Sequence, residues 1–448
     1  MLGIYDGMVM QRNQNNVCDI TVTSELPLQR VMYAGVKEGI GDVEGCGNNQ
    51  YRITGVPTGG PYTLFIDNDQ VTDVYVGDVW LLAGQSNMQG VGRPLAQEQG
   101  VEPDPEVRAY YMDNVWRPAA HPLHRPWEAF DKIHTDVLHA PQEPPHRAVG
   151  PGVAFGAELK KLTGVPQGLL CCAHGGTSLA HWSPAHKSLG GDQSLYGAML
   201  RRYIANGSHV RGMFWYQGCS DALENCVDTF ESSTISLYEE FRRDFGAELP
   251  IVQVQICRMA DCMVNARDKE WETIRELQRT LDDKVPHLCT IATLPFTLDD
   301  LIHLSGTSQN TLGKQAARCM FRLINGEQAN DCLLPPRFEG LRIAKDPFTG
   351  NGNIEITYTH LAGNLVSQGR PTGFALTTAT GEKRALIFDT QLNGNRVILR
   401  TDIPAHLLNT HLVYYGRGMD PYCNITDSQG RSLPGMGPIP VPELAETV

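Results

Sequence analysis

The sequence predicts an α/β protein in which a parallel sheet with helices on both faces is flanked by β-rich regions. Between about residues 76 and 334, apolar runs typical of buried strands alternate with helical stretches, and parallel strands need such crossover connections. On either side, short alternating segments stand between Gly, Pro and Asn clusters. We therefore expect an N-terminal β-rich segment (1–75), an α/β domain (76–334) and a C-terminal β-sandwich-like module (335–448).

Each expected element depends on a local pattern. Residues 18–23 and 62–66 alternate between apolar and polar side chains, as half-buried strands do. The apolar run Gly77–Ala83 ends in Gly84, which is typical of a buried strand that enters a turn. Helical spacing with terminal glycines, and further apolar runs, then predict helices near 154–162, 230–245, 271–281 and 312–323, and strands near 169–173, 213–216, 251–256 and 288–294.

After Pro335-Pro336 the helical period disappears, and residues 354–358, 372–377, 397–400 and 412–415 are expected to form short strands. The Pro- and His-rich stretch 93–149 is expected to be a long insertion that could line a substrate cleft. Its five histidines match no metal-ligand spacing. We therefore expect a solvated or cleft-lining loop and no metal from His121, His124, His134, His139 and His146.

Length and charge limit the possible partners. The chain has 448 residues, enough for two or three domains. It carries 37 Lys and Arg against 50 Asp and Glu, a net charge of −13, which disfavours nucleic acid and anionic membranes as partners. No apolar run approaches the ~20 residues that a membrane-spanning helix needs. A neutral partner is therefore expected.

The cysteines and the N-terminus leave the compartment open. None of the 12 cysteines has zinc-site spacing, and Cys219 with Cys226, or Cys319 with Cys332, would form disulfides only in an oxidising compartment. Residues 1–6 lack the basic and long apolar regions of a signal peptide. The protein is therefore expected to be cytoplasmic or, if a leader was removed, extracellular or periplasmic.

The first motif that carries chemistry is Gly84-Gln-Ser-Asn-Met88, at the end of the first buried strand. Gly and Asn tolerate unusual backbone angles, so the motif could be only a turn. Alternatively, it holds Ser86 as a nucleophile at the edge of the sheet. It is not the G-x-S-x-G elbow, because Met88 stands where the second Gly would be.

The second motif is Asp300-Leu-Ile-His303, which follows the expected strand 288–294. Residues three apart on a helical turn share a face. A serine hydroxyl needs an imidazole to accept its proton, and the imidazole works best when a carboxylate orients it. Ser86, Asp300 and His303 supply these three groups, although a single histidine is more often a structural residue.

Two further motifs follow strands of the same expected sheet: Ala173-His-Gly-Gly-Thr-Ser178 and Phe214-Trp-Tyr-Gln-Gly218. Glycine-rich turns expose backbone N–H groups that can stabilise an oxyanion, and Gln217 can add a side-chain N–H. In isolation, a tight turn and aromatic core packing would explain them equally well. Their shared position at strand ends favours an active site.

Together these motifs resemble the sialate O-acetylesterase and acetylxylan-esterase branch of the SGNH (GDSL-like) hydrolases. The resembling blocks are Gly84–Met88, Gly175–Thr177, Trp215–Gly218 and Asp300–His303, with flanking similarity at Asp6–Arg12, Gly77–Trp80 and Ile274–Gln278. The resemblance covers about residues 1–325 and implies a three-layer α/β/α domain that hydrolyses acetyl esters of sugars without a metal or other cofactor.

The resemblance also implies residue roles. Ser86 is expected to be the nucleophile, His303 the general base and acid, and Asp300 its orienter. The oxyanion hole is expected to comprise the Ser86 N–H, a backbone N–H of Gly175 or Gly176, and the Gln217 side chain, and the sugar is expected to contact Gln85, Asn87, His181 and Trp182.

Two positions depart from the family pattern. Cys219 stands where the family commonly has Glu, so Asp300 is expected to orient the histidine alone, with Asp221 as a weaker candidate. The segment Ser178-Leu-Ala-His-Trp182 stands where related proteins often have Pro-Ile-Glu-Ala-Trp. His181 and Trp182 are therefore expected to shape sugar specificity, which puts sialate as the substrate in doubt. A role for Cys219 as a nucleophile is disfavoured, because no basic residue stands beside it.

The sequence therefore predicts a carbohydrate O-acetylesterase that acts on an acetylated xylan-type oligosaccharide or sialic acid through an acetyl-enzyme intermediate. Two alternatives remain at this point. One is a non-catalytic carbohydrate-binding homologue of the same fold. The other is an SGNH enzyme that acts on lipids or thioesters, although the chain shows no amphipathic interfacial helix.

Overall fold

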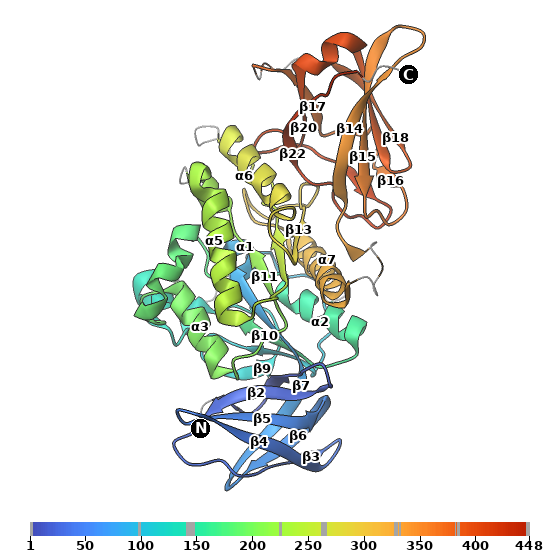
Figure 1. Ribbon diagram of the computed structural model, residues 1–448. Helices are drawn as coiled ribbons and strands as arrows, with labels where there is room; N and C mark the ends of the chain where they lie inside the picture. The colour runs from blue at the N-terminus through green and yellow to red at the C-terminus, as the bar shows by residue number, and fades with distance from the viewer. Residues whose placement is uncertain are drawn as a thin grey trace. The chain divides into compact units, whose positions relative to one another are not determined.

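The structure is a computed structural model that describes residues 3–96, 100–139, 148–223, 226–260, 267–326, 330, 333–380, 382 and 386–444. The chain forms two compact units (Figure 1). Unit 1 comprises Met1–Gln217, Ser232–Val252 and His303–Phe321, and unit 2 comprises Gly218–Glu231, Gln253–Ile302 and Arg322–Val448. The two units are described separately below.

Unit 1 begins with a β-rich region, drawn in blue in Figure 1. Its strands are β1 (Val9–Gln11), β2 (Val17–Thr23), β3 (Val31–Gly35), β4 (Gly39–Gly47), β5 (Gln50–Pro57), β6 (Gly59–Ile66) and β7 (Asp69–Gly84). Strands β2 and β6 alternate between buried and more exposed residues, as the sequence predicts for half-buried strands. The antiparallel order is β7-β6-β3-β4-β5-β2, so the β-rich expectation for this region is confirmed.

The long strand β7 joins this region to a parallel sheet. Its first half pairs antiparallel with β6, whereas its second half pairs parallel with β10 (Gln167–Cys171) and β11 (Gly212–Tyr216). Strand β10 also pairs parallel with β8 (Val107–Tyr110), which pairs antiparallel with β9 (Trp116–Pro118). All residues of β8, β10 and β11 are buried, which is typical of strands covered on both faces.

Helices cover both faces of this sheet. On one face, Phe214 of β11 stacks on Phe155 of α2 (Gly152–Thr163), with ring centroids 5.1 Å apart. On the other face, Trp215 packs edge-on against Phe241 of α5 (Val227–Phe245), at 5.4 Å. Successive residues of a strand point to opposite faces, so the expected three-layer α/β/α arrangement is confirmed. The other helices placed in unit 1 are α1 (Ser86–Gln89), α3 (Leu195–Ala205) and most of α7 (Gly306–Asn325).

Unit 2 contains α4 (Cys219–Leu223), α6 (Asp268–Leu281), β13 (Leu288–Ile291) and the end of β12 (Ile251–Val254). Its C-terminal part has a four-stranded antiparallel sheet, a three-stranded sheet and a short pair. The strands are β14 (Arg337–Lys345), β15 (Asn351–Thr359), β16 (Leu365–Ser367), β17 (Phe374–Thr378), β18 (Ile387–Asn393), β19 (Arg396–Pro404), β20 (His411–Tyr415), β21 (Ile425–Asp427) and β22 (Met436–Pro440).

The two larger C-terminal sheets share one apolar core. Ile354 and Ile356 of β15 and Leu399 of β19 lie in the same buried cluster as Val413 and Tyr415 of β20. Residues two apart along a strand point to one face, so the regular spacing of these side chains builds the core. The two sheets therefore pack around one shared core, as sheets do in a β-sandwich.

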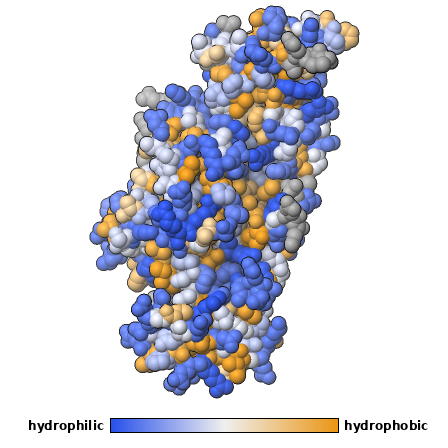
Figure 2. Space-filling view, in the orientation of Figure 1, coloured by the Kyte–Doolittle hydropathy of each residue, from blue (hydrophilic) through white to orange (hydrophobic). Residues whose placement is uncertain are grey.

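The surface of the described residues is mixed in character. On the face drawn in Figure 2, hydrophilic residues alternate with hydrophobic ones. Within the described part of the chain, no helix combines the length and the apolar character that crossing a bilayer requires.

Candidate active site

The turn after β7 places Ser86 at the carboxyl end of the parallel strands. Gly84 has φ +124, and a Cβ at this position would lie 2.2 Å from the carbonyl oxygen of Tyr216 in β11. Only glycine fits there. The next N–H, of Gln85, donates to the same carbonyl at 2.9 Å, and α1 starts at the half-buried Ser86. The chain therefore turns sharply at the edge of the sheet where ligands of α/β proteins bind.

Ser86 is in hydrogen-bond contact with His303. The Ser86 Oγ lies 2.9 Å from His303 Nε2, although the two residues stand 217 positions apart in the chain. If the hydroxyl donates, Nε2 is the unprotonated nitrogen and Nδ1 carries the proton. This distance lies in the range in which an imidazole can accept the proton of a serine nucleophile.

Asn87, the residue after Ser86, fixes the segment after His303. Its side-chain Oδ1 accepts the backbone N–H of Leu304 at 3.0 Å. The Gln309 side chain of α7 donates to the backbone carbonyl of Asn87 at 3.1 Å and to Oδ1 at 3.2 Å. Because Asn87 follows Ser86 and Leu304 follows His303, the bond between them holds Ser86 and His303 close together.

The turn Gly175–Gly176 lies beside Ser86. The N–H of His174 donates to the carbonyl of Gly84 at 3.0 Å, and a Cβ at Gly175 would lie 3.4 Å from Ser86 Cβ. The Gly175 N–H donates to the side-chain Oε1 of Gln89 at 2.6 Å. Gly176 is exposed and has φ +72. The Gly175 donor is therefore occupied in this structure.

Gln217, at the end of β11, holds the same loop from its other side. Its Nε2 donates to the carbonyl of Thr177 at 2.5 Å, and its side chain is buried. The Thr177 hydroxyl donates to the carbonyl of His174 at 2.9 Å and accepts the indole N–H of Trp182 at 3.1 Å. An amide nitrogen has two hydrogens, so an oxyanion would have to use the one that Thr177 does not.

Three of the four residues expected to contact a sugar are buried. Gln85 is 2% exposed, and Asn87 and Trp182 are 0% exposed. Asn87 instead holds the His303 segment, and Trp182 packs edge-on against Trp215 at 5.2 Å. The protein encloses these three side chains in this structure, and their contact with a sugar stays a prediction. His181 is exposed, while its Nδ1 accepts the Ser178 N–H at 3.1 Å.

The proposed orienters of the histidine belong to unit 2. Asp300 is half-buried, and its Oδ1 accepts the N–H of Ile302 at 3.0 Å. Asp221 is buried in α4. Because His303 belongs to unit 1, the orienting role of either carboxylate stays a prediction.

The Cys219 thiol is not activated. Hydrogen bonding to Cys257 and burial raise the pKa of the Cys219 thiol well above its ordinary value, whereas a nucleophilic cysteine needs a lowered pKa. Cys219 and Cys226 are both free, which excludes a disulfide between them. Cys319 is disulfide-bonded, and Cys332 lies outside the described residues.

The structure also reveals a buried histidine pair that the sequence did not indicate. His134 Nδ1 lies 2.9 Å from His174 Nδ1. Burial lowers the pKa of His174 to about 4, and burial together with the charge of His174 lowers the pKa of His134 well below its ordinary value. His174 could have been found from its place directly before Gly175, but no local pattern marks His134.

The histidine-rich insertion is less solvated than expected. His124 and His134 are both buried, and burial lowers the pKa of His121 and of His124 to about 4. His146 lies outside the described residues. Over the described ranges, no group of three or more His, Cys, Asp or Glu side chains is arranged to hold a metal.

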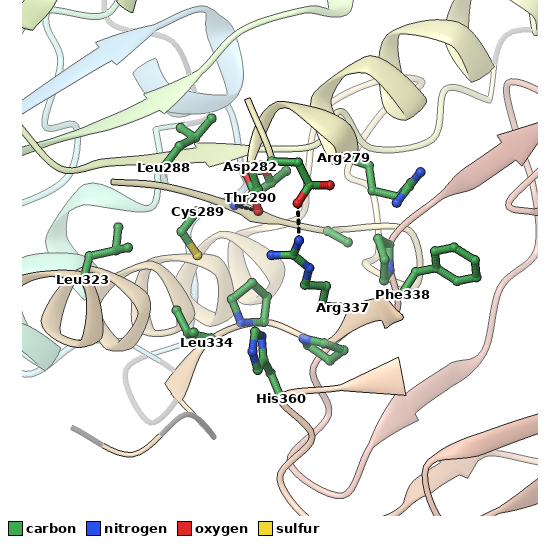
Figure 3. Close-up of a pocket in the computed structure, with 15 residues that line it drawn as sticks. Arg279, Asp282, Leu288, Cys289, Thr290, Leu323, Leu334, Arg337, Phe338 and His360 are labelled. Atoms are coloured by element: carbon green, nitrogen blue, oxygen red, sulfur yellow. Dashed lines mark hydrogen bonds and ion pairs between the residues drawn. The ribbon is translucent and has the colours of Figure 1, made fainter. Parts of the chain in front are cut away.

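A separate cavity of about 130 Å³ lies within unit 2 (Figure 3). Its polar lining residues bond to one another or to nearby groups: Arg337 pairs with Asp283, and Asp282 accepts the Thr290 N–H at 3.0 Å. Burial raises the pKa of Asp282 to about 7. Cys289 also lines the cavity, but its sulfur belongs to a disulfide. The cavity therefore lacks the serine–histidine pair that distinguishes the Ser86 turn.

Comparisons with known proteins agree with the motifs at Ser86 and His303. A family model described as carbohydrate esterase, sialic acid-specific acetylesterase, matches residues 76–322. A probable carbohydrate esterase of Arabidopsis thaliana is 26% identical over 280 residues, which cover 58% of this chain and 96% of that protein. The crystal structure of a carbohydrate acetylesterase from Xanthomonas citri has a TM-score of 0.73 at 21% identity and covers 97% of this chain and 98% of its own.

The last similarity shows that the fold of nearly the whole chain recurs in a solved structure. The family model spans more than half of the 448 residues and includes Ser86, the Gly175–Gly176 turn, Gln217 and His303. The resemblance that the motifs indicate is thereby confirmed. The chain belongs to the carbohydrate esterase family of sialic acid-specific acetylesterases, which are carboxylic ester hydrolases.

Proposed function

We propose that the protein removes acetyl groups from sugar hydroxyls by a serine mechanism. The observation that carries this proposal is the 2.9 Å contact between Ser86 Oγ and His303 Nε2 at the carboxyl end of β7. In the first half-reaction, Ser86 Oγ attacks the acetyl carbonyl carbon while His303 takes the hydroxyl proton. His303 then returns that proton to the sugar oxygen as the ester C–O bond breaks, which leaves an acetyl group on Ser86.

The second half-reaction uses the same groups with water. His303 takes a proton from the water, whose oxygen attacks the acetyl carbonyl of the acetyl-enzyme. The bond to Ser86 Oγ breaks, and His303 returns the proton to that oxygen. Acetic acid leaves and loses its remaining proton to solvent to become acetate. Both side chains regain their initial protonation states, so no metal or other cofactor is needed for the balance of atoms and charge.

Backbone donors stabilise the oxyanion in this proposal. The Ser86 N–H is adjacent to the attacking atom, and Gly175 lies close enough to Ser86 for its turn to contribute a second donor. Because Gln89 occupies the Gly175 N–H, the second donor is either the Gly176 N–H or the Gly175 N–H after the acetyl oxygen displaces Gln89. Removing one such donor typically costs about 10²- to 10³-fold in kcat.

The proposed substrates are acetylated xylan-type oligosaccharides or acetylated sialic acid. The net charge of −13 favours a neutral sugar over an acidic one. The exposed His181, three residues after Ser178, is a candidate for sugar contact, together with the buried Gln85, Asn87 and Trp182. Acetate release from acetylated sialic acid, xylan, xylooligosaccharides and pectin would rank these substrates directly.

The test of the mechanism is Ser86→Ala, with the exposed Ser188→Ala as its matched control. Ser86→Ala should lower the hydrolysis of 4-nitrophenyl acetate and of an acetylated sugar by about 10⁴-fold or more, since the other groups of a triad cannot replace the nucleophile. Ser188→Ala should keep wild-type rates. A fluorophosphonate should label wild-type protein at Ser86.

Three outcomes would contradict the proposal. Full activity of Ser86→Ala would exclude a serine nucleophile at this position. Sugar binding by wild-type protein without fluorophosphonate labelling would indicate a non-catalytic carbohydrate-binding protein. In addition, faster hydrolysis of long acyl esters than of acetyl esters would indicate a lipase-like or thioesterase-like enzyme.

A further inference from the structure

The buried pair His134–His174 joins two segments that are distant in the sequence. His134 lies in the π-helical segment η3 (Ile133–Val137), within the long insertion between β7 and α2. His174 lies in the loop that follows β10. Their Nδ1 atoms are 2.9 Å apart, their rings are stacked with centroids at 5.1 Å, and they are 1% and 5% exposed. The insertion thus supplies a hydrogen-bond partner to the loop beside Ser86.

His174 is placed so that any shift of it moves the Gly175–Gly176 turn. Its N–H donates to the carbonyl of Gly84, two residues before Ser86, and its own carbonyl accepts the Thr177 hydroxyl. The next residue, Gly175, lies close to Ser86, because a Cβ added at Gly175 would lie 3.4 Å from Ser86 Cβ and 3.2 Å from Gln89 Oε1. The contact of the insertion with the His174 ring therefore affects the position of the Gly175–Gly176 turn.

The bond between the two rings restricts their protonation. One Nδ1 must carry a hydrogen and the other must accept it, so a pair that carries two extra protons cannot form this bond. Besides burial, the charges of Arg202, His124 and Arg201 lower the pKa of His134, and the charge of His181 lowers the pKa of His174. The carboxylate of the neighbouring Asp131 accepts a hydrogen bond from Arg201 Nε at 2.5 Å. These surroundings favour a pair without added protons.

We infer that His134 is a positioning residue for the oxyanion turn: by holding the His174 ring, it fixes the backbone donors of Gly175 and Gly176 beside Ser86. The inference deepens the proposed function and rests on it. It assigns a role in the reaction to the 93–149 insertion through one side chain that touches neither Ser86 nor the acetyl group.

The experiment compares three variants by their kinetics on 4-nitrophenyl acetate. His134→Ala should lower kcat by about 10- to 100-fold with little change in KM, because a small misplacement of catalytic donors costs rate rather than binding. His134→Gln should recover most of this loss, since an amide can donate to or accept from the His174 Nδ1. His124→Ala is the matched control: it removes another buried histidine of the same insertion, which lies 3.4 Å from the carbonyl of Leu82.

Each outcome bears on one of the two proposals. An unchanged kcat in His134→Ala, or an equal loss of kcat in the stably folded His124→Ala, would overturn the positioning role. Failure of His134→Gln to recover activity would also overturn it, provided that circular dichroism shows the variant to be folded. If Ser86→Ala retains activity, the proposed function fails instead, whatever the His134 variants show.

Discussion

The Ser86 turn and the cavity of unit 2 both contain polar side chains, but these side chains have different partners. At the Ser86 turn, a hydroxyl and an imidazole lie 2.9 Å apart, and backbone and amide groups hold both. In the cavity, opposite charges are paired with one another, as Arg337 is with Asp283 and Arg279 is with Glu276 at 2.9 Å. A hollow with charged residues is therefore a weaker sign of catalysis than a nucleophile in contact with a base.

The pKa values sharpen this difference. Burial raises the pKa of Asp282 in the cavity to about 7, a value that would suit a general base. However, the hydroxyl that it contacts belongs to Thr290, which also donates to the backbone carbonyl of Gln278 at 3.1 Å. The raised pKa of Asp282 therefore affects the stability of the fold. The imidazole of His303, in contrast, contacts the Ser86 hydroxyl at the edge of the sheet.

The largest effect is expected for His303→Ala. Loss of the general base should lower kcat on 4-nitrophenyl acetate by about 10⁴-fold or more, as for other members of catalytic triads. His360 lines the cavity of unit 2, and His360→Ala should leave kcat unchanged. Both variants are compared by steady-state kinetics, with thermal denaturation to show that each is folded. A comparable loss in His360→Ala would mean that the cavity takes part in the reaction.

The sequence predicts that Ser86 and His303 lie together, but it does not predict the hydrogen bonds that hold them. Ser86 and His303 could be found because each stands in a short motif directly after an expected strand, and parallel strands bring such motifs to one edge. Neighbouring residues of a short helix point in different directions: Ser86 contacts His303, whereas Asn87, expected from the resemblance to contact the sugar, is 0% exposed and bonds to Leu304. Sequence spacing alone does not give that direction.

Side-chain contacts between segments that are distant in the sequence could not be predicted either. The alternation of strands and helices predicts the layers, because burial on one or both faces dictates the hydrophobic pattern. His134 meets His174 only through the path of the 93–149 insertion, whose sequence shows neither helical nor strand period. The partners of Arg275, in the Ile274–Gln278 block, could not be predicted from the sequence either. Its buried guanidinium donates to backbone carbonyls, including that of Gly418 at 2.7 Å.

A smaller effect is expected at the carboxylate that orients His303. We propose from the sequence spacing that Asp300 has this role, so Asp300→Asn should lower kcat by about 10³- to 10⁴-fold through loss of the correct imidazole tautomer. Asp221→Asn should cost much less. The measurement is kcat on an acetylated sugar for both variants at the same pH. Equal losses would contradict the assignment of Asp300 as the sole orienter.

The smallest effect concerns the cavity of unit 2 and is one of stability. The pKa of Asp282 is about 7 in the folded protein, against an ordinary value of 3.8. Between these values the folded state retains a proton that the unfolded state has lost, so stability falls as pH rises from about 4 to 7 and stays low above pH 7. Three pKa units correspond to about 4 kcal/mol, an upper bound because Asp282 is partly exposed.

Asp282→Asn should remove this pH dependence without affecting catalysis. The amide cannot ionise, but its oxygen can still accept the Thr290 N–H and its nitrogen can donate to the Thr290 hydroxyl. The melting temperature of the variant should therefore change little between pH 5 and pH 8, where the wild-type value falls, while kcat stays at the wild-type level. Asp283→Asn is the matched control, since it removes the neighbouring carboxylate that pairs with Arg337. If the melting temperatures of wild type and Asp282→Asn fall equally with pH, Asp282 is ionised in the folded protein. A loss of kcat in this variant would mean that the cavity takes part in catalysis, as the Ser86 turn is proposed to do.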